Sequence, residues 1–163
     1  MTNLKTFWKE LKSGQFVSMV KEASQGQTLS NSQEVFNVMK PLFTENDDVE
    51  TVFCIFLNAK NRILAIEKMF SGTISSSAIY PRELIKRIIA LKSSAIVLTH
   101  NHPSGFVEPS AEDKAITVRM AIALASIDVT LHDHIIVGDG FHSMADSGWL
   151  KSVRSRYNDL LIL

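Results

Sequence analysis

The stretch SAIVLTHNHPSGFVEPSAED, residues 94–113, contains a strand pattern, a turn-rich loop and a helix start in direct succession. Its first six residues are mostly apolar, which is typical of a central strand covered on both faces. Two prolines and a glycine then indicate a loop. The closing Ser110-Ala-Glu-Asp113 has the form of a helix N-terminal cap, in which the serine and the acidic side chain bind free N–H groups. The stretch therefore predicts a strand, a loop and a helix.

Further strand and helix patterns lie on both sides of this stretch. Residues 51–58 and 62–70 are apolar runs with a short polar connection, which predicts an antiparallel hairpin. Helical patterns cover 31–43, 81–91 and 111–126, and Pro81 stands where a first-turn proline belongs. Two more strands are expected near 129–137 and 141–145. This order predicts an α/β protein in which helices flank a mixed β-sheet.

The composition is that of one folded domain. Of the 163 residues, 45% are apolar and 21% are charged. The 17 basic and 17 acidic residues cancel, so no overall positive charge attracts nucleic acid or an anionic membrane. The apolar runs are far shorter than the roughly 18 residues of a membrane span, and the polar start has no signal-peptide core. We therefore expect a cytoplasmic protein with no membrane partner.

Cys54 is the single cysteine of the chain, which excludes an internal disulfide framework and a cysteine-rich zinc site. Its apolar neighbours, Phe53 and Ile55, predict a small buried hydrophobe and not a reactive thiol. Any metal ion must therefore be held by histidine and carboxylate side chains.

His100, His102 and Asp113 have the chemistry and spacing of such a metal site. The two histidines are two residues apart at the end of a predicted strand, so an extended backbone sends both rings to one side. The loop can return Asp113 to them, and two histidines with one carboxylate leave a fourth position open, as in catalytic zinc sites. Taken separately, the histidines could form a local hydrogen-bond device, and Asp113 could serve as part of the helix cap.

Glu67 and three further histidines need separate interpretation. Strand alternation puts Glu67 on one face with Ile63, Ala65 and Met69. If this face is buried, a partner in the metal site would offset the cost of burying the Glu67 charge. Alternatively, Glu67 lies on an edge strand and its side chain reaches solvent. His132 and His134 are predicted to share a strand face, either as support for the metal site or as ordinary polar positions. His142 has no assigned partner.

Residues 100–113 read His-x-His, seven residues, Ser, two residues, Asp, and include Pro103-Ser-Gly and Pro109-Ser. This pattern resembles that of the JAMM (MPN-domain) metalloproteases, and within them of the RadC-like proteins. The resemblance extends to Glu67, Phe70-Ser-Gly-Thr, Tyr80-Pro-Arg-Glu and Asp133-His-Ile-Ile-Val-Gly-Asp. It implies a single MPN/JAB-type domain, related to the cytidine-deaminase-like folds, over 30–148. A helical extension at 1–29 and a tail at 149–163 would complete the chain.

The resemblance also implies an activity and a role for each site residue. One Zn²⁺ per chain would be held by His100, His102 and Asp113, with Glu67 as general base and Ser110 supporting the tetrahedral intermediate. The implied function is a zinc-dependent metallopeptidase or isopeptidase that acts on an amide bond of a peptide or protein substrate.

Two other functions stay open at this point. A RadC-type role in DNA repair, recombination or mobile-element biology would require nucleic-acid binding, for which the local support is Lys86, Arg87, Lys92, Lys151, Arg154 and Arg156. A solvated charged face explains the same residues. The resemblance begins near residue 30, and Gly14 and Gly26 do not supply the hairpin of the helix-hairpin-helix region usual in RadC proteins, so we expect no such module.

The third function is a catalytically idle, metal-bearing interaction module. Its contacts, or those of a homo-oligomer, would come from the N-terminal helices or from the apolar end of the tail, Leu160-Leu-Ile-Leu.

Overall fold

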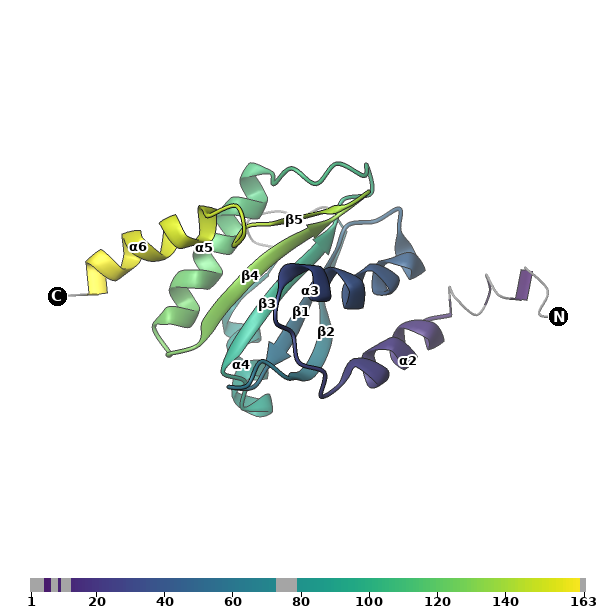
Figure 1. Cartoon of the computed structure of the whole chain (residues 1–163), viewed down its shortest axis with the longest axis horizontal. Coiled ribbons are helices and arrows are strands. Elements are labelled where there is room, and N and C mark those ends of the chain that lie inside the picture. The colour runs from purple at the N-terminus through teal and green to yellow at the C-terminus, as the bar shows by residue number, and fades with distance from the viewer. Residues whose placement is uncertain (1–4, 7–8, 10–12, 73–78, 162–163) are drawn as a thin grey trace.

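The computed structural model describes residues 5–6, 9, 13–72 and 79–161, and its centre is a five-stranded sheet with the order β2-β1-β3-β4-β5 (Figure 1). β3 and β4 run parallel, and the other neighbouring strands are antiparallel. The strands are β1 (Thr51–Leu57), β2 (Ile63–Ser71), β3 (Ala95–Asn101), β4 (Thr130–Val137) and β5 (Phe141–Ser143). The predicted mixed sheet is therefore confirmed.

Helices cover both faces of this sheet. On the near side of Figure 1 lie α2 (Gln15–Ser24), α3 (Ser32–Met39) and the 3₁₀ helix η1 (Lys40–Asn46). On the far side lie α4 (Pro81–Leu91) and α5 (Ala111–Ala125), while α6 (Trp149–Leu161) follows β5 and extends away from the sheet. The helix predicted over 31–43 ends early at Met39, because Pro41 has no N–H for an α-helical bond and its ring opposes continuation.

The two layers of helices create two apolar clusters. β1 and β3 are buried along their whole length, as the apolar pattern of 94–99 predicts. The far-side cluster packs β-sheet residues such as Val52 and Leu98 against α4 and α5, and the near-side cluster packs Phe53 and Val97 against α2, α3 and η1. Cys54 belongs to the far-side cluster and is fully buried, which raises the pKa of its thiol and confirms the expectation of a small hydrophobe.

An irregularity in β2 changes one expectation about Glu67. The pairing with β1 shifts between Phe56 and Leu57, whose partners are Ala65 and Ile63. As a result Ile63 packs in the near-side cluster, while Ala65 and Met69 pack against the far-side cluster. The predicted face shared by Ile63 and Glu67 is therefore wrong, because strict alternation fails at the shift.

The two ends of the chain are helical where the structure describes them. Gly14 directly precedes α2 and has a positive φ of 77°. The start of α6 docks through Leu150 and Val153, whereas Leu160 is 70% exposed. Leu4, Phe7 and the last two residues of the apolar tail lie outside the described residues. None of the helices that the structure describes combines the length and the apolar character of a membrane span.

Candidate metal centre

Three side chains predicted as metal ligands converge at the end of β3. The Nε2 atoms of His100 and His102 are 2.9 Å apart. His100 Nε2 lies 3.1 Å from Asp113 Oδ1, and His102 Nε2 lies 3.3 Å from Asp113 Oδ2. All three potential ligand atoms lie within 4.8 Å of one another. The extended backbone of β3 thus sends both rings to one side, as the His-x-His spacing predicts.

The surroundings of these side chains favour a bound cation. His102 Nδ1 lies 2.8 Å from the Phe106 carbonyl oxygen, which can only accept, so in the neutral ring Nδ1 carries the proton and the lone pair of Nε2 faces the cluster; only the protonated ring donates from Nε2 to Asp113. Burial alone raises the pKa of the Asp113 carboxyl, but hydrogen bonds to His100 and His102 outweigh it and hold the pKa well below its usual range. The cluster thus holds a carboxylate and imidazole nitrogen in one place, and this donor set fits a divalent metal.

Asp113 is both part of the cluster and the third residue of α5. Ser110 Oγ accepts the Asp113 N–H at 3.1 Å, and Asp113 Oδ2 accepts the Ser110 N–H at 2.8 Å, which forms a complete capping box. The cap predicted for Asp113 is therefore confirmed, and the same side chain lies in a cluster that could hold a metal ion. Ser110 is exposed, and its own hydroxyl proton is not used by the cap.

Two glycines fix the loop that joins the ligands. Gly105 has φ 85°, and its N–H donates to the His102 carbonyl oxygen at 3.0 Å, which closes a tight turn after the second histidine. A Cβ on Gly138, after β4, would lie 2.3 Å from the Gly105 carbonyl oxygen. This close backbone approach needs glycine and holds the ligand loop against the end of β4.

Glu67 has a different neighbour from the one expected. Its carboxylate accepts two hydrogen bonds from the Arg87 guanidinium on α4, one of them at 2.8 Å from Nε to Oε2. The group of ligating atoms that the described residues bring together consists of His100, His102 and Asp113. The role of Glu67 as general base therefore stays a prediction.

Glu50 is a carboxylate beside the cluster that sequence reasoning missed. Val52 pairs with His100 in the antiparallel β1/β3 register, and Glu50 directly precedes β1, so it lies at the same end of this strand pair as the histidines. The hydrogen bond with Asp113 is the main cause that raises the pKa of His102, and the charge of Glu50 adds to this effect. Glu50 directly precedes β1, the buried strand that pairs with the strand of His100. The sequence alone does not predict this pairing, because it does not depend on local spacing.

A surface cleft of about 440 Å³ opens beside Glu50. Asp48, Val49, Glu50, Gly72 and Pro103 line it, and Pro103 directly follows the ligand His102. The Gly72 N–H donates to the Glu50 carbonyl oxygen at 2.9 Å, so the end of β2 holds the backbone of this wall. The cleft reaches the neighbourhood of the cluster through Pro103, the residue after His102.

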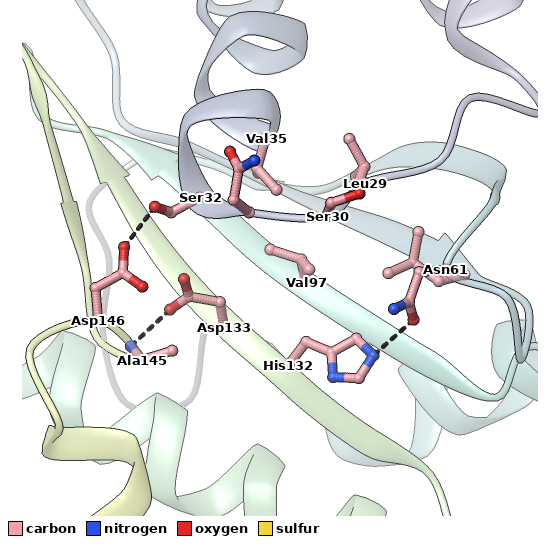
Figure 2. Close-up of a pocket in the computed structure, with 12 residues that line it drawn as sticks. Leu29, Ser30, Ser32, Val35, Asn61, Val97, His132, Asp133, Ala145 and Asp146 are labelled. Atoms are coloured by element: carbon pink, nitrogen blue, oxygen red, sulfur yellow. Dashed lines mark hydrogen bonds between the residues drawn. The ribbon is translucent and has the colours of Figure 1, made fainter.

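His132 and His134 do not share a strand face. The β3/β4 pairing shifts between Ile96 and Val97, which pair with Leu131 and Asp133, so His132 is the extra residue of β4. Figure 2 shows His132 with Nε2 at 2.9 Å from Asn61 Oδ1, in a near-side pocket that Asp133 also lines. Asp133 there accepts the N–H of Ala145 at 2.9 Å. The expectation that both histidines face one way is therefore wrong.

His134 instead contacts His100 of the cluster, on the far side. Its Nε2 lies 2.8 Å from His100 Nδ1. Burial, followed by the nearby His100, lowers the pKa of His134 well below its usual range. His142 lies on β5, where it pairs with Ile136.

Comparisons with known proteins agree with this geometry. Residues 29–149 match the RadC-like JAB domain. A UPF0758 protein of Stutzerimonas stutzeri (strain A1501) is 53% identical over 98 residues, which are 60% of this chain and 44% of that protein. A UPF0758 protein of Thiobacillus denitrificans is 40% identical over 134 residues, which are 82% of this chain and 59% of that protein. The chain spans about half the length of the curated relatives it matches. From the matched segment and the relatives together, the chain belongs to the RadC-like JAB domain family.

Proposed function

We propose that the chain is a zinc-dependent hydrolase of amide bonds, a metallopeptidase or isopeptidase, that holds one Zn²⁺ at His100, His102 and Asp113. The observation that carries this proposal is the convergence of two imidazoles and one carboxylate. Two histidines and one carboxylate leave a coordination position for water or substrate, which is the arrangement of a catalytic site and not of a closed structural one. A zinc ion bound there supplies a Lewis acid that polarises the scissile carbonyl and makes water more acidic.

The protein's own groups would move the protons. A general base takes a proton from the attacking water and passes it to the leaving amine, so it must lie on the open side of the cluster. Glu50 lies where such a base is needed, because it lines the cleft beside Pro103 and its charge raises the pKa of His102. We therefore assign the base to Glu50 and keep Glu67 as the competing candidate.

Ser110 would stabilise the charge that develops on the carbonyl oxygen. Its Oγ is fixed by accepting the Asp113 N–H at 3.1 Å, and its hydroxyl proton remains available to an oxyanion. The capping box thus holds a donor next to a metal ligand in advance of the reaction.

Two measurements test the proposal together. Elemental analysis of purified protein should find about one zinc per chain in the wild type and none in His100→Ala. A quenched-fluorescence library of peptides and lysine-linked isopeptides should then identify cleaved sequences, and Glu50→Gln should abolish cleavage while keeping zinc. Glu83→Gln, which changes an exposed glutamate on α4, is the matched control and should leave cleavage unchanged.

Other results would redirect the assignment. If Glu67→Gln abolishes cleavage and Glu50→Gln does not, the base is Glu67. Zinc binding without cleavage of any library member would favour the idle interaction module, and absence of zinc would reject the metal centre. The nucleic-acid role receives less support, because several of the basic side chains already have partners within the protein. Lys86 binds Glu83, and Arg87 binds Glu67. Arg154 donates to the carbonyl oxygens of Leu131 and His132 on β4.

A further inference from the structure

A buried series of hydrogen bonds leads from the metal ligand His100 through β4 to α5. His134 is 2% exposed, and its two ring nitrogens have different partners. Nε2 lies 2.8 Å from His100 Nδ1, and Nδ1 lies 2.5 Å from Thr117 Oγ1. Thr117, which is fully buried, has its Oγ1 2.6 Å from the carbonyl oxygen of Asp113, one turn earlier in α5. The series therefore begins at one metal ligand and ends on the backbone of another.

We propose that His134 and Thr117 are positioning residues that fix the ring orientation and the tautomer of His100 for metal binding. This inference rests on the proposed metal centre and extends it to two residues that do not contact the ion. Buried partners of this kind are common in metal sites, where the second ring nitrogen of a ligating histidine donates to a fixed acceptor.

The direction of the hydrogen bonds follows from the ligand atom. A cation takes the lone pair of His100 Nε2, so the proton of His100 must be on Nδ1, where it donates to His134 Nε2. His134 then carries its proton on Nδ1 and donates to Thr117 Oγ1. The Thr117 hydroxyl completes the series by donating to the Asp113 carbonyl oxygen, which can only accept.

The opposite direction would close the site to a cation. If the Thr117 hydroxyl donated to His134 Nδ1, the proton of His134 would lie on Nε2 and that of His100 on its own Nε2. This last proton would point toward Asp113 Oδ1, which is 3.1 Å away. The acceptor that Thr117 offers to His134 is therefore what keeps the lone pair of His100 free for metal.

Thr117→Val is the variant that isolates this contribution, because valine nearly matches the shape of threonine and removes the hydroxyl. His134 Nδ1 then loses its acceptor in a buried environment, which favours the wrong tautomer. We expect the zinc dissociation constant, measured by competition with a chromophoric chelator, to rise by about 10- to 100-fold. Thr117→Ser keeps the hydroxyl and is the matched control, with an expected change of less than about threefold.

Nitrogen-15 NMR of the zinc-loaded wild type provides a second readout that does not depend on any variant folding. His134 should be protonated on Nδ1 and His100 on Nδ1. A His134 protonated on Nε2, or an unchanged zinc affinity in Thr117→Val, would overturn the positioning role while leaving the metal centre intact. A wild type that binds no zinc would overturn the metal centre itself and this inference with it.

Discussion

Thr99 provides a direct test of how the central strand is stabilised. It lies on β3 between the metal ligand His100 and the buried Leu98, and it is fully buried. Its partners across the sheet are Phe53 on β1 and Ile135 on β4, both members of the near-side cluster. Among the described residues, its Oγ1 is the buried side-chain polar atom that has no hydrogen-bond partner. The fold therefore carries the desolvation penalty of this hydroxyl without compensation.

Thr99→Val replaces the hydroxyl by a methyl group of similar size and should stabilise the protein. A buried polar group without a partner costs about 1–3 kcal/mol, and this is the expected gain in the free energy of unfolding. For a domain of this size the gain corresponds to a rise in Tm of about 2–4 °C for each kcal/mol. Urea denaturation and thermal melting of metal-free protein measure both quantities.

Thr99→Ser is the matched control because it keeps the hydroxyl and removes the methyl group. It should lower the free energy of unfolding by about 1 kcal/mol, so the expected order of stability is valine, threonine, serine. Zinc affinity should not change in the valine variant, since alternation along β3 sends Thr99 and His100 to opposite faces. A valine variant less stable than the wild type would refute the reasoning, because it would mean that the hydroxyl has a partner.

Three further changes test other parts of the structure. Ser110→Ala removes the acceptor for the first turn of α5 and should lower the free energy of unfolding of metal-free protein by about 1 kcal/mol, as measured in urea, whereas Ser110→Thr should restore it. Arg87→Gln breaks a partly exposed ion pair with Glu67 and should leave the urea midpoint nearly unchanged with zinc content unaltered; loss of zinc would connect the pair to the metal centre. Burial, and then the charge of Arg154, lower the pKa of His132, so the unfolded chain binds this proton more readily than the folded one. Wild type should therefore lose stability relative to His132→Gln as pH falls below the unfolded value of about 6.5, and parallel urea midpoints across that range would contradict this.

The sequence predicts the elements and the convergence of His100, His102 and Asp113 well because the relevant signals are local. The apolar run of β3, the His-x-His spacing and the capping pattern before α5 each depend on residues close together in the chain. The same locality explains why Asp113 has two compatible roles. A helix start is where a loop can return a carboxylate to the strand that it left.

The parts that the sequence could not predict depend on how strands align. An extra residue in β4 turns His132 away from His134, and the shift in β2 separates Ile63 from Ala65. Neither irregularity has a signature in the strand patterns themselves. The effect of Glu50 on His102 is equally unpredictable from the sequence, because it depends on the pairing of β1 with β3 and not on spacing along the chain.

The parallel pairing of β3 and β4 brings residues of the proposed metal site together from one continuous part of the chain. Because α5 connects these two strands, the three ligands and the two residues behind His100 all belong to one continuous strand–helix–strand segment. That segment can pass intact through the gain or loss of flanking sequence. Glu50, in contrast, stands before β1, outside the segment. The proposed metal ligands and the proposed base thus belong to different parts of the chain, so a change at Glu50 would leave the proposed metal-binding segment complete.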